Sequence, residues 1–361
     1  MDLSSVLQAQ HLALGARFAV FGGWSMPVEY AAGGVLAEHQ AVRQKAGLFD
    51  VSHLGKLRLQ GPGAVDYLNS RLTNDLGRIG PGRAQYSLLC NDSGGVVDDL
   101  IVYLLSDDEV LLVPNAANTA TVASQIKLGL PDDIKLINQH RDFVVLAVQG
   151  PQSPAVMTSV GLPTEMDYMS FQLASLAGTT VTVCRTGYTG ETGFEIIAPN
   201  QVAEVLWTKI IASGVRPCGL GARDTLRTEM GYPLHGQDIS PEISPVEAGL
   251  TWAVGWQKTT FDGASALVAA KDVGPGRRLR GLKAKGRGIP RPGMLVVDTG
   301  ETGLVLGQVT SGTFSPTLKT GIALALVEPG IGFGQTVGVA IRGRVEEFEV
   351  VKPPFVVSGV H

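Results

Sequence analysis

A carboxylate inside an apolar strand is the first candidate for chemistry. Residues 185–197 read RTGYTGETGFEII, in which three glycines permit a tight turn before a strand expected at residues 194–198. Glu195 lies within that strand, and a buried carboxylate without a partner is costly. Its two oxygens could accept hydrogen bonds from two adjacent N–H groups of a ligand. The alternative is a glutamate on the solvent-facing side of the strand.

Two adjacent aspartates form the second candidate. Residues 96–105 read VVDDLIVYLL and predict the second strand of a hairpin that begins near residue 85. Successive strand residues point to opposite faces, and both faces are otherwise apolar here, so at least one of Asp98 and Asp99 is expected to point into the protein. A partly buried carboxylate often has a raised pKa and marks candidate functional sites. The alternative is an aspartate that accepts hydrogen bonds from nearby backbone N–H groups.

Two arginines on one predicted helix form the third candidate. Arg223 and Arg227 lie four residues apart, on one face of a helix expected at residues 220–230. Two guanidinium groups on one face can clamp carboxylates. The alternative is surface pairing with Asp224 and Glu229.

Residues 47–55, GLFDVSHLG, contain polar side chains that suggest hydrolase chemistry. Asp50, Ser52 and His53 are of the right types, but no separate nucleophile motif supports that function. A turn whose polar side chains bond the backbone is the favoured interpretation. Metal signals are also weak, because the six histidines are isolated and the three cysteines form no CxxC motif.

Composition indicates an ordinary globular protein of more than one domain. The chain has 361 residues, of which 44% are apolar and 17% charged, and its net charge is −4. These values argue against disorder and against general binding of polyanions such as nucleic acid. Scattered cysteines fit a reducing compartment. No apolar run approaches the roughly 18 residues of a membrane helix, and no basic leader precedes an apolar segment, so the cytoplasm is the expected location and no membrane is expected as a partner.

The helices and strands predicted around these candidate site residues indicate two α+β units followed by an all-β region. A Gln-Gly-Pro motif at residues 60–62 and again at 149–151 follows a predicted strand and precedes a predicted helix, which suggests a weak internal duplication. Asn115 or Asn118 could cap a helix that runs to about residue 128. From residue 277, short strands alternate with Gly and Pro turns, as in a barrel or jelly roll. The basic run at 277–291 could steer an acidic partner or form a solvated face.

Five stretches together resemble the T-protein, or aminomethyltransferase, family of the glycine cleavage system. They are residues 47–55, 94–103, 185–197, 219–227 and 310–318, and they occur in the family's order over nearly the whole chain. The resemblance implies an α+β multidomain fold, a three-domain cloverleaf with two α/β units and a C-terminal β-barrel or jelly roll. The expected domains are 1–140 with parts of 220–275, a ferredoxin-like unit at 141–219, and the barrel at 276–361.

The resemblance also implies a reaction and its residues. The aminomethyl carbon would pass from the lipoyl arm of the carrier H-protein to tetrahydrofolate, giving 5,10-methylenetetrahydrofolate and ammonia without a metal. Glu195 matches the family's pterin-binding glutamate, and Asp99 matches its essential aspartate, which would stabilise positive charge near the folate nitrogens. Arg223 matches a substrate-contact arginine. Four further residues match folate-contact positions: Tyr86, Asn115, Tyr168 and Tyr188.

The chain departs from the family pattern in three places. Thr192 stands where the family usually has Asp, His235 stands where many relatives have Tyr, and a folate contact that some relatives place in a longer tail has no counterpart. Two alternatives share the fold: folate-dependent demethylases, and non-enzymatic folate-binding proteins that support iron–sulfur proteins. The motif of the latter has a cysteine before its tyrosine, where this chain has Gly187. The basic run at 277–291 is the hypothetical docking face for H-protein.

Overall fold

The computed structural model describes residues 2–300 and 303–360 and groups the chain into two compact units. Unit 1 comprises Met1–Leu89, Asp98–Arg223 and Gly359–His361, and unit 2 comprises Cys90–Val97 and Asp224–Ser358. All seven residues that the sequence nominates for the site belong to unit 1.

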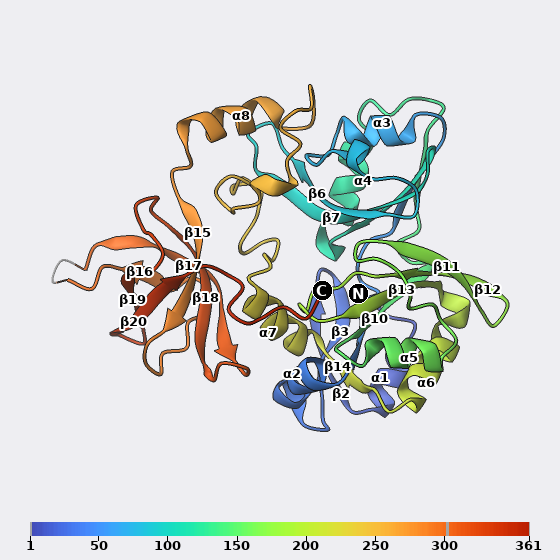
Figure 1. The fold of residues 1–361 in the computed structure, drawn as a ribbon, viewed down its shortest axis with the longest axis horizontal. Helices are drawn as coiled ribbons and strands as arrows, with labels where there is room; N and C mark the ends of the chain where they lie inside the picture. The colour runs from blue at the N-terminus through green and yellow to red at the C-terminus, as the bar shows by residue number, and fades with distance from the viewer. Residues whose placement is uncertain (1, 301–302, 361) are drawn as a thin grey trace. The chain divides into compact units, whose positions relative to one another are not determined.

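A six-stranded sheet forms one layer of unit 1 (Figure 1). Apolar residues of its central strands and of two helices form one hydrophobic cluster, which includes Leu146, Ile196, Leu206 and Ile210. The helical spacing of the last two residues places them on one face, which is why that helix packs on the sheet. In spatial order the strands are β11 (Phe171–Leu176), β12 (Thr179–Cys184), β13 (Gly193–Pro199), β10 (Phe143–Gln149), β4 (Gly47–Asp50) and β14 (Arg216–Cys218), and the helices of the cluster are α5 (Ser153–Ser159) and α6 (Ala203–Ala212).

A five-stranded sheet contains the predicted hairpin. Strand β7, which lies between β6 and β8, carries Asp98, which is fully buried, and Asp99, which is half-buried. The strands lie in the order β6 (Ala84–Cys90), β7 (Val96–Ser106), β8 (Glu109–Pro114), β5 (Leu57–Gln60) and β9 (Lys135–Asn138). Three helical segments accompany it: α3 (Ala64–Asn69), η2 (Ala116–Asn118) and α4 (Thr119–Lys127).

A small N-terminal sheet completes the strands of unit 1. It has the order β1 (Leu3–Ser4), β3 (Trp24–Tyr30) and β2 (Ala16–Phe21). The helices nearest to it in sequence are α1 (Gln8–Ala13) and α2 (Gly34–Gln44).

Unit 2 contains a closed six-stranded barrel, drawn in orange to red in Figure 1. Its interior is filled by aliphatic residues and Phe348, which is fully buried. The boundary between the units falls within α7 (Leu220–Met230), and α8 (Ala264–Val273) precedes the barrel in sequence. Around the barrel the strands are β15 (Arg278–Ala284), β18 (Thr320–Val327), β17 (Val305–Ser315), β16 (Leu295–Val297), β19 (Thr336–Ile341) and β20 (Arg344–Val351).

The predicted fold class, α+β with a C-terminal β-barrel, is confirmed. The division into three domains at residues 140, 219 and 276 stays a prediction. β5 and β10 each lead through a Gly-Pro turn into a helix, as the repeated motif predicts. Within the described residues, no helix has the length and apolar character needed to cross a membrane.

Candidate functional site

Asp98 is held by two asparagine side chains. Its carboxylate accepts hydrogen bonds from the Asn115 backbone N (2.9 Å), Asn115 Nδ2 (2.9 Å) and Asn118 Nδ2 (2.7 Å). Burial, and next the charge of Asp99, raise the pKa of Asp98 above its usual range. The helix-capping interpretation of the two asparagines is wrong, since neither side chain caps a helix. They stabilise a buried carboxylate instead.

Asp99 points to the opposite face of β7 from Asp98 and shares the hydrogen-bond donor Asn115 with it. Tyr86 Oη donates to Asp99 Oδ2 at 3.0 Å, and Asn115 Nδ2 donates to Asp99 Oδ1 at 2.8 Å. Asn115 therefore bridges the two aspartates. These contacts fix the orientation of the Asp99 carboxylate while leaving it half-buried, as a group that meets a substrate requires.

Glu195 is buried, and only one of its oxygens is engaged. The side chain is 8% exposed, so the solvent-face interpretation is wrong. Thr186 Oγ1 donates to Oε2 at 2.5 Å, and Tyr103 Oη on β7 lies 3.2 Å from Thr186 Oγ1. Among the residues that the structure describes, Oε1 has no hydrogen-bond partner. Thr186 was not predicted from the sequence, although its place directly before the glycine-rich turn is a usable signal.

Arg223 is near enough to Glu195 for the two charges to interact, and one nitrogen of its guanidinium has no hydrogen-bond partner among the described residues. Its guanidinium covers the Tyr188 ring, with Cζ 4.7 Å from the centroid. Burial lowers the pKa of Arg223, while Glu195 and Tyr188 act in the opposite direction. Nη1 is buried and has no partner within residues 2–300 and 303–360.

The predicted clamp of two arginines is wrong. Arg227 is 2% exposed and is held within unit 2 by acidic partners. Its Nε donates to Asp224 Oδ1 at 2.8 Å and its Nη1 to Asp238 Oδ2 at 2.8 Å. Arg227 therefore pairs with Asp224, as the alternative held, but as a buried side chain and not at the surface.

Two of the predicted tyrosines lie near charged residues of the site: Tyr86 near Asp99, and Tyr168 near Glu195. Burial raises the pKa of Tyr86, and the neighbouring Asp99 and Tyr188 add to that effect. Tyr168 is 39% exposed, and burial and then Glu195 raise its pKa. The structure thus brings Tyr86, Asn115 and Asp99 together in one cluster. Of the other four, Arg223 contacts Tyr188 directly, and the charge of Glu195 acts on the pKa values of both Arg223 and Tyr168.

The Asp50 segment is a turn with a buried network, as expected. The Ser52 backbone N donates to Asp50 Oδ1 at 2.9 Å, and His11 Nε2 lies 2.8 Å from Asp50 Oδ2. In the described part of the chain, the His53 side chain makes no hydrogen bond to this network. Lys56, which the sequence did not single out, is 1% exposed; burial lowers its pKa to about 7, and its Nζ donates to the Ser52 carbonyl at 2.8 Å.

Two departures from the family pattern have structural roles. Thr192 Oγ1 donates to the Gly359 carbonyl at 2.8 Å, and the Gly359 N donates to the Gly190 carbonyl at 2.7 Å. The tail therefore holds the glycine-rich turn that precedes Glu195. In unit 2, His235 Nε2 lies 3.0 Å from the Val96 carbonyl.

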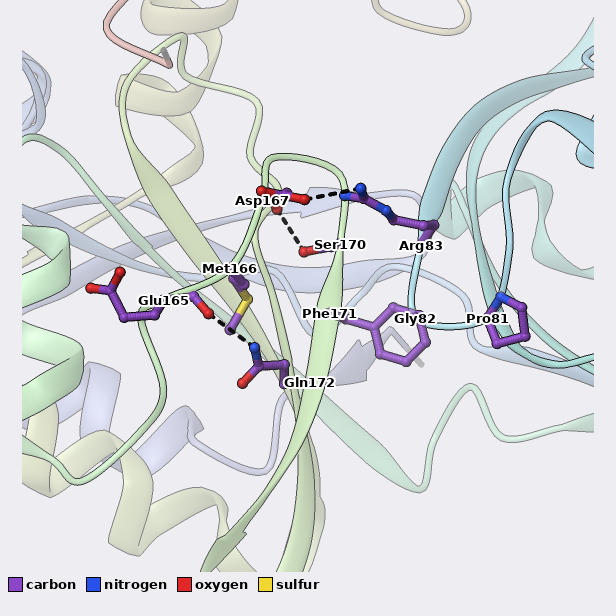
Figure 2. A pocket seen from close by; sticks show the side chains of 9 residues that line it. All are labelled: Pro81, Gly82, Arg83, Glu165, Met166, Asp167, Ser170, Phe171 and Gln172. Carbon is purple, nitrogen blue, oxygen red and sulfur yellow. Dashed lines mark hydrogen bonds and ion pairs between the residues drawn. The ribbon is translucent and has the colours of Figure 1, made fainter.

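A separate pocket of about 440 Å³ lies in unit 1 (Figure 2). Residues of 81–83, 165–167 and 170–172 line it, and Arg83 forms an ion pair with Asp167 at 2.9 Å. None of the predicted site residues lines it. Across the described residues, no three His, Cys, Asp or Glu side chains are grouped to hold a metal ion.

Two family models together match most of the chain. Residues 7–258 match the GCVT N-terminal domain, and residues 277–356 match the glycine cleavage T-protein C-terminal barrel domain. The α+β fold with a barrel and buried carboxylates is therefore of the T-protein class. The chain belongs to the glycine cleavage T-protein family.

Similar proteins of known sequence and structure support this family membership. The chain is 56% identical over 356 residues to the "Aminomethyltransferase" of Mycobacterium bovis, covering 97% of this chain and 96% of the relative. It is 55% identical over 358 residues to that of Frankia alni, covering 98% of both. The crystal structure of glycine cleavage system aminomethyltransferase T from Bartonella henselae matches with a TM-score of 0.94 and 36% identity over 99% of each chain. The predicted enzyme class, an aminomethyltransferase, is confirmed.

Proposed function

We propose that this protein transfers the aminomethyl carbon from the lipoyl arm of H-protein to tetrahydrofolate. Two bonds from folate nitrogens to that carbon form, and its bonds to sulfur and to the departing ammonia break, leaving a lipoyl thiol and 5,10-methylenetetrahydrofolate. The observation that supports folate binding is that Glu195 is buried while its Oε1 has no hydrogen-bond partner among the described residues. The comparisons do not favour the demethylase or the non-enzymatic alternative.

Glu195 is the group we assign to the pterin ring. A pterin presents an exocyclic amine beside a ring N–H, two adjacent donors that match the two oxygens of a carboxylate. Thr186 holds Oε2, which can still accept a second hydrogen bond, and Oε1 is unpartnered among the described residues. A buried acceptor pair of this kind rejects ligands that lack either donor.

Asp99 is the group we assign to the chemistry. Tyr86 and Asn115 hold its carboxylate in one orientation. There it would stabilise the positive charge that develops when a folate nitrogen attacks the aminomethyl carbon. Tyr188 would stack against the folate, with Arg223 behind its ring, and Tyr168 would contact the folate from the rim.

H-protein is the partner we assign, with no nucleic acid and no membrane, and the cytoplasm stays the predicted location. The basic run at 277–291 is partly neutralised within unit 2, since Arg277 Nε lies 2.7 Å from Glu247 and Lys285 Nζ 2.9 Å from Glu347. Arg278 and Arg280 have no acidic partner in the described part of the chain, so we assign docking to these two.

The proposal is tested by incubating the protein with aminomethylated, lipoylated H-protein and following 5,10-methylenetetrahydrofolate. We expect product only when tetrahydrofolate is present. Folate binding without product would favour the non-enzymatic alternative, and product from an N-methylated amine in place of the carrier would favour a demethylase.

A further inference from the structure

The two copies of the Gln-Gly-Pro motif differ in the surroundings of their glutamine. Gln60 ends β5 and is exposed, whereas Gln149 ends β10 and is fully buried. A glutamine amide carries two N–H donors and an acceptor oxygen, so burying it is costly unless both ends find partners. The partners that Gln149 finds therefore show what its burial accomplishes.

Both ends of the Gln149 amide form hydrogen bonds to the glycine-rich turn and the start of β13. Nε2 donates to the Thr186 carbonyl at 3.1 Å and to the Phe194 carbonyl at 3.4 Å. Oε1 accepts from Thr189 Oγ1 at 2.8 Å. A reversed amide would place its oxygen against two carbonyl oxygens, so these contacts select one orientation of the side chain.

Two glycines of the turn leave the space that this amide occupies. A Cβ at Gly187 or at Gly193 would overlap the Gln149 side chain. Gly193 pairs with Gln149 across β13 and β10, so the contact follows from the register of the sheet. Neither glycine has a positive φ, so space and not backbone conformation explains glycine at these two positions. The turn is therefore packed around the Gln149 amide.

The residues that Gln149 binds are those that hold Glu195. Thr186 Oγ1 donates to Glu195 Oε2 at 2.5 Å, and Phe194 directly precedes Glu195 on β13. Gln149 thus fixes the backbone of the residue that donates to Glu195 and the backbone next to Glu195 itself. We propose that Gln149 is a positioning residue, which acts through Thr186 and Phe194 to orient the Glu195 carboxylate towards the two donors of the pterin. This inference rests on the proposed folate function.

The test compares two ligands by equilibrium binding to wild type and three variants. The ligands are tetrahydrofolate and 2-desamino-2-methyltetrahydrofolate, in which a methyl group replaces the exocyclic amine that Glu195 would bind. Gln149→Met keeps the length of the side chain and removes its hydrogen bonds, and Thr189→Val removes the donor to Gln149 Oε1. Gln60→Met is the matched control, the same substitution at the exposed glutamine of the other motif copy. Each preference is a ratio within one variant, so a general loss of folded protein cancels.

We expect wild type and Gln60→Met to prefer tetrahydrofolate by about tenfold or more, because the carboxylate loses a charge-assisted hydrogen bond when the amine is absent. Gln149→Met should reduce that preference to about threefold or less, since a carboxylate that is free to turn distinguishes the two ligands less well. A preference of wild-type size in folded Gln149→Met, with both ligands weakened equally or not at all, would overturn the inference. If Gln149→Met does not fold, Thr189→Val decides by the same criterion. Failure of wild type to bind tetrahydrofolate, or to prefer it, would instead refute the proposed recognition of the pterin.

Discussion

Replacing Glu195 with Gln tests pterin recognition by a change of only a few atoms. The carboxylate would accept two charge-assisted hydrogen bonds from the pterin, each of about 1.5–3 kcal/mol. Gln keeps one acceptor but turns an NH₂ donor towards a ligand donor. Since Thr186 can still donate to the amide oxygen, the local fold should persist. The expected loss is about 2–4 kcal/mol of binding free energy, or roughly 30-fold to 1000-fold in Kd.

Titration calorimetry with tetrahydrofolate measures this loss, and thermal unfolding checks that the variant is folded. Glu204→Gln is the matched control, because Glu204 is exposed on α6 of the same unit and the same substitution there should leave Kd unchanged. A change of less than about threefold in Glu195→Gln would refute the reasoning, since that is below the value of one charge-assisted hydrogen bond.

Three further predictions concern stability and docking. Asp98→Ala removes the acceptor of the Asn115 backbone N–H and should lower the free energy of unfolding by about 2 kcal/mol, measured by denaturant titration. Because the pKa of Lys56 is lowered in the folded state, wild type loses stability as pH falls from 10.5 towards 7. Lys56→Met lacks this penalty, so its free energy of unfolding minus that of wild type should increase by about 3 kcal/mol between about pH 9.5 and 7, measured by denaturant titration at each pH. A difference that stays constant with pH would contradict this. Reversing the charges of Arg278 and Arg280 should weaken H-protein binding at low salt, measured by calorimetry, and unchanged affinity would remove the docking assignment.

The sequence predicted much of the fold because its strands have strong local patterns. The hairpin of β6 and β7 and the strand β13 were placed within about two residues, since alternation and glycine-rich turns are local signals. Helix α8 was not predicted.

The site was predictable as far as it depends on residue type within an element. Carboxylates at Glu195 and in the Asp98–Asp99 pair contradict the apolar pattern around them, and that contradiction identified them. Their partners were not predictable. Asn118 reaches Asp98 across 20 positions of sequence, where local reasoning favours a helix cap.

The central claim is that Asp99 promotes the transfer of the aminomethyl carbon to tetrahydrofolate. Its most direct test is the rate of ammonia release from aminomethylated H-protein, with and without tetrahydrofolate, for wild type and Asp99→Asn. The account predicts release that requires tetrahydrofolate and that falls by about 10²-fold or more in the variant, because a preorganised charge is lost at the reacting nitrogen. Full activity in Asp99→Asn would contradict the role assigned to Asp99, and release that does not depend on tetrahydrofolate would contradict the proposed function.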